Sequence, residues 1–146
     1  MMTFLPYPDF RQSLEALDMK RLGNQRRESK LCHLTLQGED SRWKWHPCVK
    51  MWRGYEDALA EYYNLNIDVW MARGYKNTME KIPHAPVRYP HWLGDAEFHA
   101  RQRAALLEKN PEWYGRFGWK EIPKIDYIWP AGLDRLRNRA YPASDL

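Results

Sequence analysis

The sequence predicts a mainly α-helical fold in one compact domain. Apolar side chains recur at intervals of three and four in several segments, as on one face of a helix. No stretch alternates apolar and polar residues regularly enough to indicate a sheet, and 146 residues is the size of one ordinary domain. We therefore expect three main helices joined by long loops, with residues 1–146 forming a single domain.

The first helix is expected near residues 9–19. The prolines of TFLPYPDF keep the preceding segment extended, and Asp9 is a suitable N-cap. Its apolar stripe consists of Phe10, Leu14 and Leu17.

The next helix is expected to end at about Gln37, before Gly38. Its leucines point in several directions, which predicts a helix that passes through the protein interior; they are Leu22, Leu31, Leu34 and Leu36. Four polar residues at i, i+3, i+4 and i+7 form one ridge along it: Arg21, Asn24, Gln25 and Glu28.

The polar, aromatic-bearing loop EDSRWKWHP leads to a helix that Pro47 can open. Its expected packing residues are Val49, Met51, Trp52, Tyr55, Leu59 and Tyr62. We expect a break near Asn64-Leu65-Asn66 and then a further turn through Ile67 and Trp70, ended by Arg73-Gly74-Tyr75.

Residues 76–94 contain three prolines and are expected to form a long irregular connection over the surface. Asp95 then caps a helix from about 96 to 109, which Asn110-Pro111 stops. PEWYGRFGW is a short aromatic segment. The remaining tail has room for one more short helix, with solvated Arg135, Arg137 and Arg139.

Composition narrows the class of protein. No apolar run approaches the length of a membrane span, and the first residues lack the pattern of a signal peptide, so we expect a soluble cytoplasmic protein. The two cysteines, Cys32 and Cys48, form no ligand-like or disulfide-framework pattern.

The net charge is +4, and the excess lies in residues 1–54, which carry ten Lys and Arg against six Asp and Glu. This asymmetry fits a nucleic-acid-binding face, although many basic proteins bind no nucleic acid.

The ridge around Glu28 has two interpretations. It is either a solvated helix face with weak ion pairs, or a carboxylate placed in a cationic cleft made for DNA phosphates. The cluster Trp113, Tyr114, Phe117 and Trp119 is similarly either core or a surface on which nucleobases stack. The histidine and cysteine spacings match no zinc site, and phosphate-binding glycine loops are absent, so no metal or cofactor is expected.

Three segments, LGNQRRES, ARGYKNT and PEWYGRFGWK, together resemble the phage-type pyrimidine-dimer DNA glycosylases, a family also called endonuclease V. The resemblance covers residues 1 to about 120, and residues 121–146 form a C-terminal extension that has no counterpart in it. The matching residues are Leu22, Arg27 and Glu28, then Arg73, Gly74 and Tyr75, and finally Pro111, Trp113, Tyr114, Phe117 and Gly118.

The resemblance implies a monomeric repair enzyme that acts on double-stranded DNA. Glu28 corresponds to the catalytic glutamate of the family, whose nucleophile is the α-amine of an N-terminal Thr. That amine corresponds to Thr3, or else the amine of Met1 serves instead. An α-amine is appreciably neutral at pH 7, so it can attack a sugar and form a Schiff base. The residues expected to contact DNA are Arg21, Gln25, Arg26, Arg27, Arg103, Trp113, Tyr114 and Lys120.

The chain departs from the family at several positions. Met1 and Met2 precede Thr3, so Thr3 becomes the first residue only if translation starts at Met2. Phe4 stands where the family has Arg, and at least one turn is inserted before Leu22. Two alternatives therefore remain: a DNA-binding module without catalysis, and a related enzyme that acts on modified pyrimidines.

Overall fold

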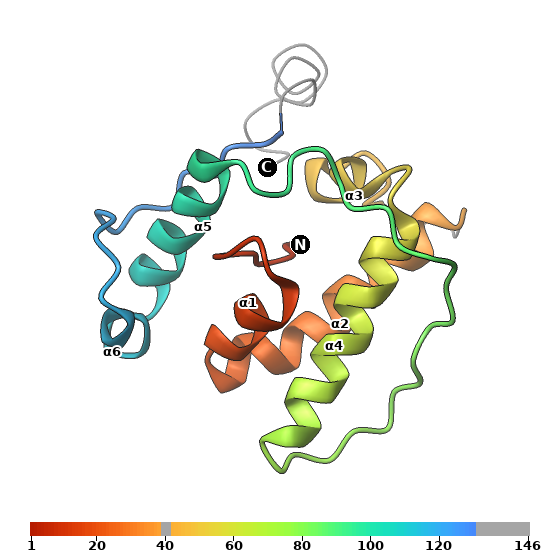
Figure 1. Cartoon of the computed structure of the whole chain (residues 1–146), viewed down its shortest axis with the longest axis horizontal. Helices are drawn as coiled ribbons and strands as arrows, with labels where there is room; N and C mark the ends of the chain where they lie inside the picture. The colour runs from red at the N-terminus through yellow and green to blue at the C-terminus, as the bar shows by residue number, and fades with distance from the viewer. Residues whose placement is uncertain (39–41, 131–146) are drawn as a thin grey trace.

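In this computed structural model, residues 1–38 and 42–130 are described. Within them the chain forms helices and no strand, which confirms the mainly α class (Figure 1). The elements are α1 (Phe10–Ala16), α2 (Met19–Leu36), α3 (Pro47–Trp52), α4 (Glu56–Ala72), α5 (Ala96–Lys109), α6 (Pro111–Tyr114) and the 3₁₀ turn η1 (Gly115–Phe117). The three longest helices, α2, α4 and α5, correspond to the three main helices that were expected. The tail helix and its three arginines lie outside the described residues.

The first predicted helix is shorter than expected. Asp9 is its N-cap, as predicted, and accepts a hydrogen bond from the Gln12 amide at 2.8 Å. The helix ends at Ala16 because Leu17 and Asp18 are extended, and Asp18 is the N-cap residue of α2. Tyr114, far along the chain, bonds both the amide and the carboxylate of Asp18. This tertiary contact stabilises a break that local sequence did not indicate.

Helix α2 packs mainly against α4. The glycine at position 23 permits close approach, since a Cβ there would lie 3.1 Å from the Trp70 ring. The buried face of α2 is partly polar, because it consists of Leu22, Gln25, Ser29, Cys32 and Thr35. Leu34 is 38% exposed and Leu31 and Leu36 are half-buried, so α2 does not pass through the interior as its leucine pattern predicted.

The break in the middle of the chain occurs ten residues before the predicted place. Gly54 has φ +87, a left-handed conformation that glycine adopts without strain, and it separates α3 from α4. Helix α4 then continues through Asn64-Leu65-Asn66. The Asn66 side chain donates to the Leu22 carbonyl at 3.0 Å, and Asn64 bonds both the amide and the carbonyl of Ile82. These asparagines join the helix to its neighbours and do not end it.

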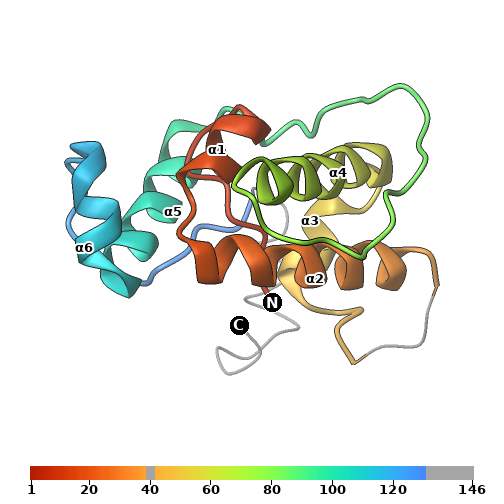
Figure 2. The same cartoon turned by 90° about the horizontal axis from the view of Figure 1, so that it is seen from below.

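Residues 76–94 form the irregular connection that was expected, and they run along the outside of α4 (Figures 1 and 2). The Asn64 bonds to Ile82 and the Tyr63 bond to the Glu80 carbonyl hold this loop to α4. Asp95 caps α5 as predicted, and Asn110 both ends α5 and caps α6. No helix within residues 1–38 and 42–130 is long and apolar enough to cross a membrane.

The core is rich in aromatic side chains. Trp52 lies at its centre and contacts the rings of Phe10, Tyr62 and Trp92. The N-terminal segment enters this core, and Figures 1 and 2 show it surrounded by α1, α2, α3 and α5. Thr3, Phe4 and Leu5 are all buried. Residues 3–5 are therefore part of the folded interior.

Candidate active site

The backbone of residues 2–5 is extended, and buried side chains satisfy its polar groups. Gln25 accepts a hydrogen bond from the Phe4 amide at 2.7 Å and donates one to the Met2 carbonyl. The Tyr62 hydroxyl lies 2.7 Å from the Phe4 carbonyl oxygen and 3.0 Å from Gln25 Oε1. Buried backbone groups without such partners would be costly, so these side chains fix the path of the segment.

Two residues of α5, Gln102 and His99, bind the backbone of Leu5. Gln102 accepts a hydrogen bond from the Leu5 amide at 3.3 Å, and His99 Nδ1 lies 2.7 Å from the Leu5 carbonyl oxygen. Burial lowers the pKa of His99. A neutral ring with its proton on Nδ1 is therefore the form that donates to this carbonyl.

The side chain of Thr3 is anchored between α3 and the core. Its hydroxyl oxygen accepts a hydrogen bond from Trp52 Nε1 at 2.9 Å and lies 3.5 Å from Cys48 Sγ. Thr3 is 1% exposed. The residue expected to carry the nucleophile is thus held rigidly beside α3.

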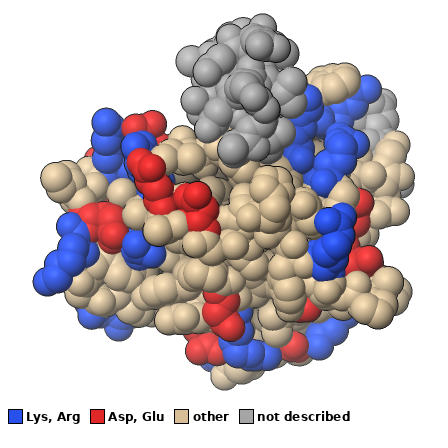
Figure 3. Space-filling view, turned by 45° about the horizontal axis from the view of Figure 1, so that its top comes forward, with Lys and Arg blue, Asp and Glu red and all other residues tan. Residues whose placement is uncertain are grey.

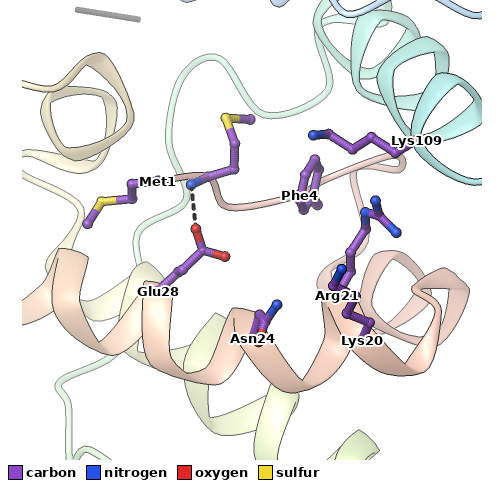
Figure 4. A pocket seen from close by; sticks show the side chains of 8 residues that line it. Met1, Phe4, Lys20, Arg21, Asn24, Glu28 and Lys109 are labelled. Carbon is purple, nitrogen blue, oxygen red and sulfur yellow. Dashed lines mark hydrogen bonds between the residues drawn. The ribbon is translucent and has the colours of Figure 1, made fainter.

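Glu28 faces this segment from α2. Its Oε1 accepts a hydrogen bond from the Met2 amide at 3.3 Å, and its side chain lines a cavity of about 250 Å³ (Figure 4). The lining residues are Met1, Met2, Phe4, Lys20, Arg21, Asn24, Glu28 and Lys109. The first residues of the chain and the predicted catalytic carboxylate therefore meet in one pocket.

The charge around this pocket is unequal. Glu28 is the single carboxylate among the lining residues, whereas Lys20, Arg21 and Lys109 are cationic. Arg21 also forms a salt bridge of 3.2 Å with Asp18, which holds its guanidinium at the helix start. Three cations near one carboxylate favour an anionic ligand at the pocket mouth.

His46 lies at the start of α3, near the N-terminal amine. Its Nδ1 accepts a hydrogen bond from the Cys48 amide at 3.0 Å, as an N-cap does. Burial and then the positive charge of the N-terminus lower the pKa of His46 to about 4. His46 is therefore neutral at pH 7 and adds no charge beside the amine.

Of the residues predicted to contact DNA, only Arg21 lines the pocket. Arg26 turns away from it, with its guanidinium 4.3 Å from the Trp70 ring centre and 2.7 Å from Asn77 Oδ1. Arg27 is exposed and donates to Asn24 at 2.9 Å. These three arginines thus point to different surroundings although they lie within six residues of one another.

Gln25 and Tyr114, both predicted to contact DNA, are buried, so neither side chain offers a surface to DNA in this structure. Every polar atom of the Gln25 side chain has a partner in the protein, and the Tyr114 hydroxyl is bonded to Asp18. Burial, together with that Asp18 hydrogen bond, raises the pKa of Tyr114. Both residues position other parts of the chain.

The remaining predicted contacts lie away from the pocket lining. Arg103 makes two bonds to Glu121, at 2.9 and 3.1 Å, and one to the Pro6 carbonyl. Trp113 is half-buried, and its Nε1 donates a hydrogen bond to the Ala16 carbonyl. The Arg116 guanidinium lies over the Trp113 ring, 3.8 Å from its centre. Lys120 is exposed.

Sequence reasoning missed several residues of the pocket. Lys20 precedes Glu28 by two turns of the same helix, so helical spacing alone indicates it, as it did for Asn24 of the polar ridge. Met2 and Phe4 adjoin the predicted nucleophile in sequence. Lys109 comes from the end of α5, and no local pattern connects it with Glu28. Among the described residues, no group of three His, Cys, Asp or Glu side chains is arranged to hold a metal ion.

A family model described as pyrimidine dimer DNA glycosylase matches residues 1–83, more than half of the chain. The chain belongs to this family. This match confirms the family resemblance that the sequence motifs indicated. As a pyrimidine dimer DNA glycosylase, the protein acts on DNA. The matched region contains α1 to α4 and Glu28, and it ends before α5 and Lys109. Searches of curated proteins and of solved structures gave no match.

Proposed function

We propose that this pyrimidine dimer DNA glycosylase excises pyrimidine dimers or related pyrimidine lesions and then cleaves the strand at the resulting abasic site. The nucleophile is an α-amine of the N-terminal segment, on Thr3 if the chain is trimmed to that residue or on Met1 otherwise. Glu28 is the catalytic carboxylate. The observation that carries the proposal is the 3.3 Å contact between the Met2 backbone nitrogen and Glu28 Oε1 inside the pocket.

The anchoring of the segment supports this role. Gln25, Tyr62 and Gln102 fix the backbone that follows Thr3, and Trp52 fixes the Thr3 side chain. An amine on Thr3 would lie one residue along the chain from the nitrogen that Glu28 already contacts. A nucleophile held in this way loses little further freedom on reaching the reactive geometry.

The chemistry follows from an amine and a carboxylate in one pocket. The amine attacks C1′ of the damaged nucleotide, and the bond from C1′ to the base breaks. The sugar ring then opens to give an imine between C1′ and the amine nitrogen. Loss of a C2′ proton breaks the bond from C3′ to its oxygen and nicks the strand, and water finally releases the amine. Glu28 stabilises the positive charge that develops at the sugar and assists the proton transfers.

The cations around the pocket fit the backbone of the damaged strand. Lys20, Arg21 and Lys109 line the pocket beside Phe4, the position at which the family has Arg. Lysines and arginines bind phosphates through charge, and arginine also through directed hydrogen bonds. We propose that these three residues hold the phosphates that flank the lesion.

One observation favours a second candidate, a DNA-binding protein without catalysis. Met1 and Met2 line the pocket, and the Met2 amide already bonds Glu28. A chain that retains both methionines therefore has its carboxylate engaged by a backbone group. This candidate predicts salt-dependent DNA binding without strand cleavage.

Borohydride reduction distinguishes the two candidates. The purified protein is incubated with a duplex that carries a thymine dimer or an abasic site, reduced, and examined for a covalent adduct. The first candidate predicts an adduct at the N-terminal residue, which mass spectrometry identifies together with the true start of the chain. If neither DNA gives an adduct, the first candidate is rejected.

Glu28→Gln tests the carboxylate. We expect strand cleavage to fall by a factor of about 100 or more, because general acid–base catalysis contributes factors of this size. Binding of the same DNA should remain, since the cations that contact phosphates are unchanged. Cleavage at the wild-type rate in Glu28→Gln would contradict the role given to this residue.

A further inference from the structure

The loop before α3 presents an exposed tryptophan among basic side chains. Trp45 is 57% exposed, with Lys44 Nζ 5.2 Å and Lys50 Nζ 5.0 Å from its ring centre. Arg42, also exposed, lies over the neighbouring Trp43 ring. We refer to Lys44, Trp45 and Lys50 as the Trp45 patch. In the view of Figure 3, Lys and Arg side chains gather at the upper right of the molecule. This is the side on which α3 lies in Figure 1.

The loop is anchored, so the exposure of Trp45 is part of a defined structure. The Trp43 carbonyl accepts a hydrogen bond from the His46 amide at 2.8 Å, and the Trp43 ring meets the His46 ring edge-on. The His46 ring in turn packs against Trp129, which is 2% exposed. Trp43 and His46 therefore hold the loop against the core, and the indole of Trp45 is left in solvent.

The Trp45 patch lies close to the candidate active site. Cys48, three residues after Trp45, contacts the Thr3 hydroxyl. His46, one residue after Trp45, is near enough to the N-terminal amine for its positive charge to lower the His46 pKa. The pocket cations Lys20 and Arg21 belong to the beginning of α2, on another element. The patch thus adds a basic and aromatic surface on the α3 side of the N-terminal segment.

We propose that Trp45 stacks on an unpaired nucleobase of the DNA substrate while Lys44 and Lys50 bind the phosphates next to it. This inference rests on the proposed function, and it names a contact to the substrate outside the pocket. An indole offers a flat face to any base, and lysines beside it neutralise the backbone of the same strand. The two ammonium groups sit on flexible stems, so they can move to phosphates when a base occupies the ring face.

Binding measurements test this contact in a Glu28→Gln background, in which we expect DNA to be bound with little cleavage. The probes are two duplexes of one sequence around a stable abasic-site analogue, one fully paired elsewhere and one with two unpaired bases beside the analogue. We expect Trp45→Ala and Trp45→Leu to raise the Kd for the second duplex by about tenfold or more, and Trp45→Phe to raise it much less. The effect on the fully paired duplex should be smaller.

The lysines and a control complete the test. Lys44→Ala and Lys50→Ala should each reduce the slope of log Kd against log salt by about 0.9. The matched control is Tyr89→Ala, another exposed aromatic, whose ring packs on Phe10 and whose hydroxyl bonds Glu61. It should leave both Kd values unchanged.

Two outcomes would overturn the proposal: a Kd that Trp45→Ala changes by less than twofold, or an equal loss on both duplexes, which would indicate that Trp45 contacts DNA without stacking on an unpaired base. A patch that serves a protein partner would give the first outcome. The borohydride adduct of the otherwise wild-type protein reports on the proposed function separately, so failure of the stacking contact and failure of the chemistry are distinguishable.

Discussion

Gln25 is a polar residue whose side-chain oxygen and nitrogen both have hydrogen-bond partners inside the protein. Its amide accepts from the Phe4 amide, contacts the Tyr62 hydroxyl and donates to the Met2 carbonyl. The side chain is 0% exposed. A residue in this position determines where the N-terminal segment lies relative to Glu28, three residues farther along α2.

Replacing Gln25 should therefore affect stability and catalysis together. Gln25→Ala leaves the Phe4 amide and the Met2 carbonyl without partners, and we expect it to lower the free energy of unfolding by about 2–3 kcal/mol. Adduct formation should fall as well, because the amine is no longer fixed. Urea denaturation measures the first effect, and Gln12→Ala on the exposed face of α1 is a control that should cost under about 0.5 kcal/mol.

His46 makes a second residue-scale prediction, for pH. Its folded pKa of about 4 lies below its ordinary value of 6.5, so protonation favours the unfolded chain. Stability that is fully present above pH 6.5 is therefore lost as the pH falls toward 4, by at most about 3 kcal/mol. His46→Asn retains an N-cap acceptor but does not titrate, and its stability should depend less on pH across this window. Equal pH dependence of both proteins in urea denaturation would contradict the assignment.

At the scale of elements, the helix boundaries differ in how they are encoded. Asp9 and Asp95 are N-caps that bond amides three residues ahead, so local sequence is sufficient to predict them. The break at Asp18 depends on Tyr114 from α6, and the break at Gly54 depends on a left-handed φ. Local apolar spacing continues across both breaks and conceals them.

Gly54 allows a direct test of the second break. Its Cβ would meet nothing closer than the Arg88 guanidinium at 3.9 Å, so Gly54→Ala adds conformational strain without a steric clash. We expect it to lower stability by about 1–2 kcal/mol, the cost of a left-handed residue. Gly115→Ala is the matched control: Gly115 has φ −62 and open space around it, so its replacement should be neutral or slightly stabilising. Thermal or urea unfolding of the two variants makes the comparison.

At the scale of the whole molecule, the end of the described chain completes the core. The family model matches residues 1–83, yet Trp129 is 2% exposed within the core and packs against His46. Arg103 and Glu121 form a paired bridge between α5 and the returning chain. We propose that residues 1–38 and 42–130 fold as one domain, in agreement with the single domain expected from the chain length.

Trp129→Ala tests this contribution. We expect it to lower the free energy of unfolding by about 3–5 kcal/mol, because it removes a large buried side chain and leaves a cavity. Ile122→Ala, on the same returning segment but 84% exposed, should change it by less than about 0.5 kcal/mol. Similar small effects of both would show that the segment packs only loosely on the core.

The sequence by itself determined the helical class, the N-caps at Asp9 and Asp95, the irregular connection at residues 76–94 and the family. It also placed Glu28 on a polar ridge of one helix and matched it to the catalytic glutamate of the family. These features depend on local spacing, capping chemistry and motifs, which a single chain displays directly. The tertiary structure decided that Met1, Lys109 and Glu28 share one pocket, and that Gln25 and Tyr114 position other groups inside the protein. The physical reason is that burial and hydrogen-bond partners are set by residues distant in sequence, such as Asp18 and Tyr114, which are 96 positions apart.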